Sequence, residues 1–543
     1  MKKFFSLLYR DYLYLAFFLL ALIVRLIFIW QWSGTPYFSH FNADAWVHDL
    51  WAKEIASGDI IRHTAFYQSP LYPYLLAVIY KFLGHHFFPV YIIQSFMDAF
   101  SCALIANSAR IMFNRRTAAM AGIISALYVP FIFNTGLLLK ETLTVFCVSA
   151  FLLLLLKSID GKITEKRTVL YAAGWGTFLG AAALSRPNMA GIFLFAALWI
   201  IYRSFPGIFS FKNTFSKISE KSSSLWKLFK KNIISAFFGM FLMLLPQTIH
   251  NAIASHDFVL FNYAGGFVFY LGSNQYADGT TTYPPGITSD PILEERQIYE
   301  IAENETGRKL RPSEVSSFWL KQGIKAVKEN PRRFFWLTIG KFYLFWNKYE
   351  VPDNYDLSFI RRHFHTIISV PLFAYSFVAS LGVLGLFMCG IARRGGILPA
   401  LFWPYMLSLM PFIITDRYRI PAVVFLIIAA AYTLNRLYVK FLSDAGKVLM
   451  PVICSLFFWL VIALPTPCNL VFAEAAGYAD LSCKYSESEE HVKAVKCFEQ
   501  AESLYADAVG ESAAMCAAYS YGQLGRDSMR RHVMSSYGLE LEE

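Results

Sequence analysis

The chain has 543 residues, of which 56% are hydrophobic and 16% are charged, and its mean hydropathy is +0.42. This composition excludes a soluble globular protein, because repeated apolar runs approach the ~20 residues with which a helix crosses a bilayer. The formal net charge of +11 does not indicate a nucleic-acid partner, because the basic residues are spread over short loops between apolar runs, where they set membrane topology.

The lengths of the apolar runs and the placement of Lys and Arg predict an all-α polytopic membrane protein with about eleven transmembrane helices. Lys2, Lys3 and Arg10 precede the first run, so we expect the N-terminus in the cytoplasm. The first run shows no small-residue cleavage site, and we expect an anchor rather than a removed signal peptide. The predicted spans lie near residues 12–32, 88–112, 117–134, 138–157, 168–185, 188–203, 232–250, 366–391, 397–414, 420–437 and 448–466.

Two long loops, 33–87 and 251–365, are expected on the outer face of the membrane. In the first, PLYPYLLAVIYKFL at 70–83 is short for a span and is expected to form an interfacial or re-entrant helix. The second contains a charged helical stretch near 291–330. A basic stretch at 211–231 is expected in the cytoplasm.

The aromatic segment 331–349 is long enough to resemble a further span. Counting it as a span would put Arg393 and Arg394 outside and Asp416 inside, against the positive-inside rule. We therefore interpret the segment as interfacial or partly buried.

Residues 1–466 form the predicted membrane domain, and the Ala- and Glu-rich tail 467–543 is expected to be soluble and external. Small and bulky residues alternate in the tail at helical spacing, which resembles a degenerate tetratricopeptide-type helix pair that could bind a protein partner. The tail holds four of the eight cysteines: Cys468, Cys483, Cys497 and Cys516. In an oxidising compartment these allow three disulfide pairings, and the alternative is free cysteines on helix faces.

Several charges lie where the hydrocarbon makes them costly, at roughly 2.5–3.5 kcal/mol each on insertion scales. His250 and Arg25 are interpreted as structural, with Arg25 as a buried ion-pair partner. The positive-inside rule does not account for arginines at the outer face, which indicates that they bind anions. The unexplained charges at that face are Asp44 of the NADAW motif, Lys140, Glu141, Arg186, Asp416, Arg417 and Arg419.

An acid and several cations at the outer leaflet suit transfer from a phosphate-linked lipid. A sugar on a lipid phosphate already carries a good leaving group, so the site must deprotonate an acceptor and offset the charge that grows on the phosphate. Asp44 is the candidate catalytic base, and Glu141 is a second catalytic acid that could orient the acceptor or pair with a cation. The candidate donor-phosphate ligands are Arg186, Arg417, Arg419 and the weaker candidate Lys140.

Each of these residues also has a structural interpretation. Asp44 could cap a helix that starts at Ala45. Lys140 and Glu141 could pair with neighbouring spans, and the arginines could be loop residues or extend toward lipid headgroups. The co-location of the charges, rather than any one of them, favours catalysis.

Several motifs follow one another in a characteristic order: NADAW, SPLYPYLLAVIYKFLG, LLKETL, LSRPN, FWNKYEVPDNYD and DRYRIPAVVFLIIAAAY. This ordered set resembles the GT-C glycosyltransferases of the protein O-mannosyltransferase and aminoarabinose-transferase type, which use dolichyl- or polyprenyl-phosphate sugars. The resemblance covers about residues 1–440 and does not extend to the tail.

The resemblance implies a GT-C type helix bundle and an inverting transferase in the bacterial inner membrane, with its active site facing the periplasm. It implies Asp44 at the catalytic position, Glu141 as a second acid, and the arginines of LSRPN and DRYRIP near the donor phosphate. Protein O-mannosyltransferases carry an Asp-Glu pair in the first loop, whereas Ala45 follows Asp44 here, which argues against protein O-mannosylation as the specific activity.

The predicted function is transfer of one sugar from a polyprenyl-phosphate donor to a lipid, glycan or protein acceptor. Two alternatives stay open: a transporter or flippase for lipid-linked sugars, and an oligosaccharide ligase or polymerase. A transporter would show paired halves with matched interrupted helices, and the sequence shows no such repeat. A membrane scaffold would account for the tail but not for the outer charges.

The predicted partners are the lipid-linked donor, membrane lipids and the acceptor, with no nucleic acid. We expect no obligatory metal cofactor, although Asp44 and Glu141 could share a divalent cation such as Mg²⁺ or Mn²⁺. No Cys/His spacing in the sequence suggests a zinc site.

Overall fold

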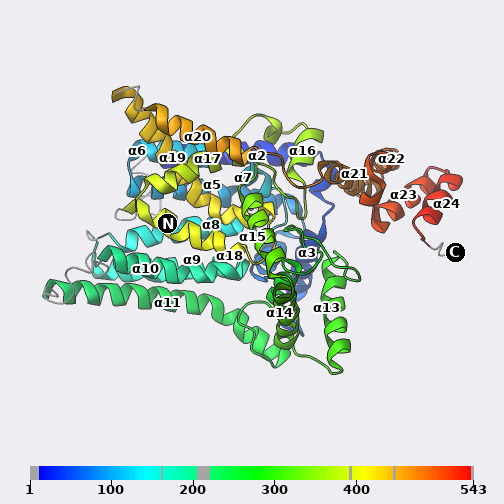
Figure 1. The fold of residues 1–543 in the computed structure, drawn as a ribbon, viewed down its shortest axis with the longest axis horizontal. Coiled ribbons are helices and arrows are strands. Elements are labelled where there is room, and N and C mark those ends of the chain that lie inside the picture. The colour runs from blue at the N-terminus through cyan, green and yellow to red at the C-terminus, as the bar shows by residue number, and fades with distance from the viewer. Residues whose placement is uncertain (1–11, 161–162, 205–219, 391–393, 444–447, 540–543) are drawn as a thin grey trace.

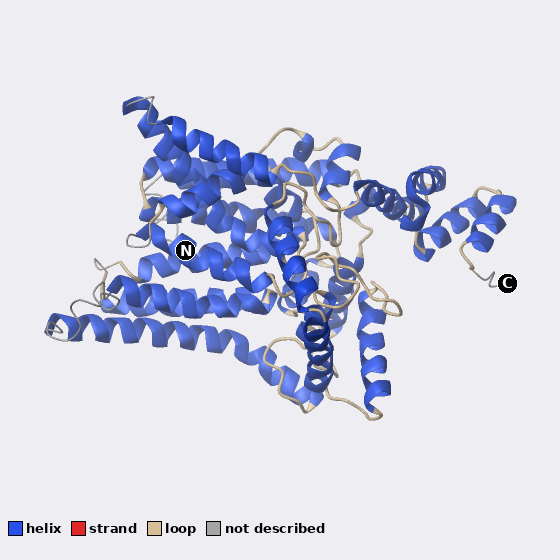
Figure 2. Cartoon of the chain, in the orientation of Figure 1, coloured by secondary structure: helices blue, strands red, loops and turns tan. Residues whose placement is uncertain are grey.

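The computed structural model describes residues 12–160, 163–204, 220–390, 394–443 and 448–539, and the regular elements in these ranges are helices (Figure 2). In the same ranges the one β-type pairing is an isolated bridge between Tyr128 and Phe373. The prediction of an all-α protein is therefore confirmed. Expectations for Lys2, Lys3, Arg10, residues 211–219 and Arg393 concern positions outside the described residues.

Six helices among the described residues are long and apolar enough to cross a membrane, and the chain is a multi-pass membrane protein. They are α2 (Tyr12–Trp32), α5 (Phe87–Met112), α8 (Glu141–Ser158), α9 (Glu165–Ser185), the Lys230–Ser255 part of α11 (Glu220–Ser255), and α19 (Asp416–Ser443). Four other predicted spans are shorter apolar helices: η2 (Pro187–Gly191) with α10 (Ile192–Ser204), α17 (Tyr375–Met388), α18 (Ile397–Leu409) and α20 (Leu449–Ile462). Helix length alone therefore does not confirm the predicted number of spans.

The predicted span 117–134 is not one helix. It is divided into α6 (Arg115–Ala126) and α7 (Val129–Asn134). Pro130 explains the interruption, because proline has no backbone N–H to donate to the Ala126 carbonyl and its ring clashes with that turn of a continuous helix.

The interruption frees two carbonyls that a buried arginine uses. The Val129 amide donates to the Phe373 carbonyl at 3.0 Å, so the Ser125 carbonyl also lacks its usual helical donor. The guanidinium of Arg25, in the middle of α2, donates to the carbonyls of both Ser125 and Ala126. The helix break and the buried charge thus satisfy each other's hydrogen bonds.

Arg25 also forms the predicted ion pair. Its Nε lies 2.6 Å from Oδ2 of Asp98 on α5, and both side chains are almost fully buried. The pair joins α2 to α5 inside the bundle, and the sequence-based interpretation of Arg25 is confirmed.

The two long loops, 33–87 and 251–365, fold into helices at one end of the bundle. The first forms α3 (Ala43–Ser57) and α4 (Leu71–Leu83), and the second forms α12 (Gly265–Leu271), α13 (Pro291–Thr306), α14 (Pro312–Glu329), α15 (Pro331–Trp346) and α16 (Leu357–His363). Helices α13, α14 and α15 run across the direction of α8 to α11 (Figure 1), and the loops gather beside them (Figure 2). Helix α15 is not among the candidate spans, which agrees with the interpretation of 331–349.

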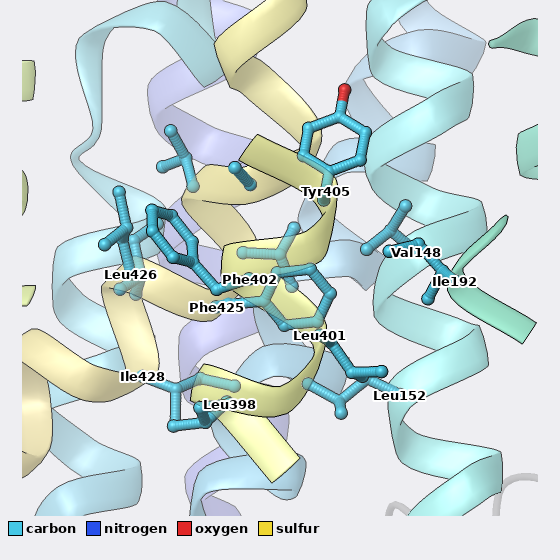
Figure 3. Close-up of a cluster of buried hydrophobic side chains, with 14 of the residues drawn as sticks. Val148, Leu152, Ile192, Leu398, Leu401, Phe402, Tyr405, Phe425, Leu426 and Ile428 are labelled. Atoms are coloured by element: carbon cyan, nitrogen blue, oxygen red, sulfur yellow. The ribbon is translucent and has the colours of Figure 1, made fainter. Parts of the chain in front are cut away.

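A buried apolar cluster fixes the ends of two helices that carry predicted site residues. Leu398, Leu401 and Phe402 of α18 belong to one cluster with Phe425 of α19 and Leu152 of α8 (Figure 3). Helices α8 and α19 begin with Glu141 and Asp416, respectively. Packing in this core therefore sets where both N-termini lie.

The tail forms four helices with a small core of its own: α21 (Leu470–Glu487), α22 (His491–Tyr505), α23 (Glu511–Gln523) and α24 (Asp527–Ser536). A disulfide between Cys483 and Cys516 joins α21 to α23, and Cys468 and Cys497 are free. The structure thus selects one pairing that the sequence alone left open.

We expect the protein to lose stability when one member of the buried Arg25–Asp98 pair is removed and the other is left unpaired. Arg25→Met should lower the free energy of unfolding by about 3–5 kcal/mol, because it leaves Asp98 buried without a partner. Arg25→Met/Asp98→Leu should recover part of this loss, since no charge is left unpaired while two carbonyls still lack a donor. Thermal unfolding of the purified proteins in detergent measures both effects.

The matched control is Lys231→Met, which breaks an exposed ion pair with Glu165. We expect this control to cost less than about 1 kcal/mol. A double variant as unstable as Arg25→Met would contradict the argument.

Candidate active site

Asp44 lies in the first turn of α3, where the helix dipole favours a negative charge. The helix begins at Ala43 with Asn42 as its N-cap residue, so Asp44 is not the cap that the sequence allowed. Its Oδ1 accepts a hydrogen bond from Nε2 of Gln68 at 2.9 Å, and its Oδ2 lies 2.7 Å from a terminal nitrogen of Arg417. The carboxylate is thus bound by side chains rather than by its own helix.

Arg417, in the first turn of α19, joins Asp44 to a second carboxylate, Asp353. Its Nε donates to Oδ2 of Asp353 at 2.8 Å, and a terminal nitrogen contacts the same oxygen. Burial raises the pKa of Asp44, but the charges of Arg417 and Lys140 and the hydrogen bond from Arg417 outweigh it and hold that pKa well below its ordinary value. Asp44 is therefore ionised at neutral pH.

Glu141 and Arg186 form a second pair, at 2.6 Å, in which both side chains are buried. Glu141 begins α8, and Arg186 directly follows α9. The guanidinium of Arg186 also lies over the ring of Tyr418, 4.5 Å from its centre. Glu141 therefore pairs with a residue next to a neighbouring span, as its structural interpretation expects. This pair lies in the same cluster as the other predicted site residues.

Lys140 connects the two pairs electrostatically. Its pKa is lowered to about 8, first by burial and also by the charges of Arg186 and Arg417, while the charges of Asp44 and Glu141 oppose the shift. In the described part of the chain its ammonium group has no hydrogen-bonding or ionic partner. The structure thus brings five predicted site residues into one cluster and leaves one cation there without a protein partner.

His48 belongs to the cluster, although the sequence analysis did not select it. It lies one helical turn after Asp44 on α3, and its Nδ1 is 2.9 Å from the Leu138 carbonyl. A carbonyl only accepts, so Nδ1 carries the proton and Nε2 presents a lone pair. Burial lowers the pKa of His48 to about 4, against the charge of Asp44, so the ring is neutral at pH 7.

Three buried polar atoms in this cluster lack a partner among the described residues: Nε2 of His48, Oε2 of Glu141 and Nε of Arg186. Buried polar atoms are nearly always hydrogen-bonded, so each unpaired atom calls for an explanation. The three atoms include donors and acceptors and come from α3, α8 and the end of α9. A polar ligand with hydroxyl and phosphate groups would satisfy them.

Arg419 lies elsewhere than the sequence prediction placed it. Its guanidinium donates to the carbonyls of Phe345, Asn347 and Tyr349, and it stacks 4.0 Å from the centre of the Tyr375 ring. These contacts fasten the end of α15 to α19. Of the two arginines in the DRYRIP motif, only Arg417 contacts the candidate site carboxylates.

The remaining outer residues have structural partners. The backbone amide of Asp416 donates to the Val351 carbonyl at 2.9 Å. The ring of His250 stacks on Phe66 at 4.1 Å, and its Nε2 accepts from the amide of Arg62. The structural interpretation of His250 is confirmed.

The two carboxylates proposed for a divalent cation are each paired with an arginine. Arg417 pairs with Asp44, and Arg186 pairs with Glu141. The described residues contain no group of three or more His, Cys, Asp or Glu side chains placed to hold a metal. This donor set does not fit a metal centre.

The sequence contained signals for the residues that were missed. His48 follows Asp44 at helical spacing, and Asp353 lies in the VPDNYD motif that contributed to the family resemblance. Glu294 of α13 gave no signal, because it is one of several charges in a long loop. Only the fold shows that Asp353 shares an arginine with Asp44.

Glu294 is the third carboxyl that the outer loops bury near the site. The hydroxyls of Tyr67 and Tyr283 both donate to it, the latter at 2.6 Å. The pKa of Glu294 is raised to about 7, first by burial and also by the charges of Asp44 and Asp353, while the two tyrosine hydrogen bonds oppose the shift. The group therefore titrates close to neutral pH.

This raised pKa predicts a pH-dependent stability. The stabilising effect of a protonated Glu294 should be complete below its ordinary pKa of 4.5 and should be lost as the pH rises through about 7. The full effect is at most about 3 kcal/mol. Glu294→Gln should remove this contribution, so its thermal unfolding midpoint should fall less than that of the wild type between pH 5 and pH 8.

The control is Glu300→Gln, which changes an exposed carboxylate on the same helix. It should keep the pH dependence of the wild type. Parallel pH profiles for wild type and Glu294→Gln would show that Glu294 does not titrate in this range.

Part of the chain is similar to a known protein family. Residues 67–213 match the family model described as dolichyl-phosphate-mannose-protein mannosyltransferase. No curated protein sequence matches the chain. The matched range contains Lys140, Glu141 and Arg186 but begins after Asp44 and His48.

The chain also has a distant likeness to solved structures. ArnT from Cupriavidus metallidurans bound to undecaprenyl phosphate has 12% identity and a TM-score of 0.46, over 96% of this chain and 79% of that one. The archaeal oligosaccharyltransferase AglB from Archaeoglobus fulgidus, with an inhibitory peptide and a dolichol-phosphate, has 12% identity and a TM-score of 0.40, over 87% of this chain and 58% of that one. The Archaeoglobus fulgidus oligosaccharyltransferase in complex with Zn and sulfate has 14% identity and a TM-score of 0.41, over 86% and 55%.

The chain therefore spans less than two thirds of the length of the archaeal enzyme. The family resemblance inferred from the ordered motifs is confirmed by the match of residues 67–213. Residues 67–213 are thus similar to the family of dolichyl-phosphate-mannose-protein mannosyltransferases, and this match covers less than half of the chain.

Proposed function

We propose that this protein is an inverting glycosyltransferase that moves a single sugar from a polyprenyl-phosphate donor to a lipid, glycan or protein acceptor. The observation that carries the proposal is the buried cluster in which Asp44 shares Arg417 with Asp353 beside the Glu141–Arg186 pair. The cluster supplies an ionised carboxylate, a cation without a protein partner, and unpaired polar atoms of both kinds.

The proposed reaction is one displacement at the anomeric carbon of the sugar. The acceptor oxygen or nitrogen forms a bond to that carbon while the bond to the phosphate oxygen breaks, and polyprenyl phosphate leaves with the electron pair. Asp44 accepts the proton of the acceptor. A single displacement inverts the anomeric configuration.

Arg186 and Lys140 are proposed to bind the donor phosphate. Nε of Arg186 is buried and unpaired, so it can donate to a phosphate oxygen without giving up Glu141. The ammonium group of Lys140 adds a positive charge between the two ion pairs. Both groups would offset the negative charge that develops on the leaving phosphate.

Arg417 and His48 are proposed to orient the reacting groups. Arg417 holds Asp44 through one nitrogen and Asp353 through the others, so the carboxylate has a defined direction. The lone pair on Nε2 of His48 can accept a hydrogen bond from a hydroxyl of the acceptor or of the sugar. Glu141 is proposed to keep Arg186 in place and to contact the acceptor through its unpaired oxygen.

We also infer the topology on which this function depends. The shorter apolar helices and the broken α6–α7 segment would complete a GT-C bundle of about eleven membrane segments. The active site and the tail 467–543 would then face the outside of a bacterial inner membrane, with the N-terminus in the cytoplasm. Accessibility of a C-terminal tag to a reagent that cannot cross the membrane tests this arrangement.

The function is tested with purified protein and a panel of polyprenyl-phosphate sugars. Mass spectrometry detects the glycosylated acceptor, and NMR of the product gives its anomeric configuration. Donors with diphosphate-linked oligosaccharides form a second arm, and reaction with these alone would indicate a ligase or polymerase. A third arm adds a chelator, and loss of activity that Mg²⁺ or Mn²⁺ restores would contradict the expectation that no metal is required.

Asp44→Asn should lower turnover by about 10²- to 10⁴-fold, because the amide cannot accept the acceptor's proton. The variant should remain folded, since Arg417 keeps Asp353 as a partner. Turnover with saturating donor measures the effect, and the thermal unfolding midpoint checks the fold. Near-normal turnover of a folded Asp44→Asn protein would rule out the assigned base.

The loss of the Lys140 charge should make kcat/KM fall at alkaline pH. Its pKa of about 8 means that the ammonium group is charged below this pH and loses its charge as the pH rises, so kcat/KM should fall with an apparent pKa near 8. Lys140→Arg should move this decrease to much higher pH, because arginine stays charged. Lys140→Gln should lower kcat/KM at neutral pH by about 10- to 100-fold.

These profiles are measured with a neutral acceptor whose own ionisation lies outside the range. A decrease near pH 8 that persists unchanged in Lys140→Arg belongs to another group and refutes the assignment.

A further inference from the structure

The first tail helix, α21, contacts both chain segments that carry the carboxylates of the candidate site. One is the stretch before Asp44, and the other is α16, which follows Asp353 closely in the chain. None of the motifs that match the glycosyltransferase family lies in α21. The contacts therefore raise the question of what a tail outside that family resemblance does at the site.

The contact with the Asp44 segment is polar and buried. Nζ of Lys484 donates to the Phe41 carbonyl at 3.0 Å, and the Lys484 side chain is only 5% exposed. Asp480 lies one helical turn earlier, beside the Tyr37 hydroxyl and the Asn42 side chain. Burial raises the pKa of Asp480. Lys484 and the hydrogen bonds from Asn42 and Tyr37 oppose this shift, because they favour the charged carboxylate.

The contact with α16 is apolar, with an ionic edge. Leu481 shares a buried cluster with Tyr37 and Phe359, so α21 fills the space between the two segments. Gly477 packs directly on Phe359, and a Cβ at this position would lie 2.5 Å from the ring. At the edge, Glu474 accepts from His363 at 2.8 Å.

The backbone between these contacts and Asp44 is strained. Ala43 has a φ of +37°, a left-handed conformation that an alanine rarely adopts. Such a residue keeps its conformation only when its surroundings determine it. Two contacts hold the residues just before Ala43. Lys484 donates to the Phe41 carbonyl, and the side chain of Asn42 donates to the Asn354 carbonyl at 3.1 Å.

We propose that α21 is a positioning element of the active site, which holds the 41–43 backbone and α16 so that Asp44 and Asp353 meet the same guanidinium of Arg417. Lys484 acts on Asp44 through Phe41 and does not touch the substrate. The tail is then required for the chemical step as well as for any partner that it binds. The effect on transfer rests on the proposed function, whereas the positioning itself does not.

Two variants of the full-length protein test the proposal. Lys484→Met removes the donor to Phe41, and Gly477→Ala forces α21 away from Phe359 although alanine favours a helix more than glycine does. Their controls are Lys493→Met, which changes an exposed tail lysine, and Gly522→Ala, where a Cβ has room. Lys484→Arg keeps a donor and should restore the wild-type behaviour.

The first readout is hydrogen exchange of the backbone amides in peptides covering 36–46 and 357–363. We expect faster exchange in both test variants and unchanged exchange in the controls. The second readout is kinetic: kcat should fall about tenfold or more, with a KM for the donor within about twofold, because misplacement of a catalytic group affects the chemical step most. Both are measured at a temperature at which thermal unfolding shows every variant folded.

Unchanged exchange in both peptides would overturn the proposal, because it would show that α21 does not hold these segments. Unchanged kcat with faster exchange would overturn it too, since the contact would then not position the catalytic group. If the wild-type protein transfers no sugar from any donor of the panel, the proposed function fails by itself, and hydrogen exchange alone then decides whether α21 holds the two segments.

Discussion

Arg417 joins two carboxylates from segments that are far apart in the chain, and the active-site arrangement depends on this junction. Asp44 lies 373 residues before Arg417 in the chain, and Asp353 lies 64 residues before Arg417. The carboxylates of Asp44 and Asp353 contact the same guanidinium, so without this shared cation they would repel each other in surroundings of low dielectric. The planar guanidinium can donate to both at once, which an ammonium group cannot do with the same geometry. The loop 33–87, the loop 251–365 and α19 are therefore joined at one point.

The charges of the cluster are balanced before any substrate arrives. Asp44, Asp353 and Glu141 supply three carboxylates, and Arg417, Arg186 and Lys140 supply three cations. A phosphodiester that enters adds one negative charge, which favours the protonated form of Lys140. Helices α3, α8 and α19 all begin at the cluster, and their N-termini also favour an anion. The site is thus neutral when empty and well prepared to accept a phosphate.

Much of this arrangement could be predicted from the sequence. Membrane residence, the all-α fold, the pairing of Arg25 and the identity of five clustered site residues followed from apolar runs and from charges in costly places. Predictions failed where a tertiary contact decided the outcome. The span at 117–134 is broken because Pro130 frees carbonyls that Arg25 uses, and a pattern of apolar residues does not contain that partnership. Arg417 and Arg419 look alike in the sequence, and only the fold directs one to the carboxylates and the other to backbone carbonyls.

The Arg25 network also constrains the order in which the protein can be made. Arg25 leaves the ribosome in the first span, 73 residues before Asp98 and 101 before Ala126. During that interval the arginine has none of its final partners, and its insertion must rely on the other side chains of α2. Each Leu, Ile, Phe or Val contributes only about 0.3–0.6 kcal/mol, so roughly five to ten of them are needed to offset one arginine. The strongly apolar sequence of α2 is therefore suited to carry an unpaired charge into the membrane until the second and third membrane segments have been synthesised.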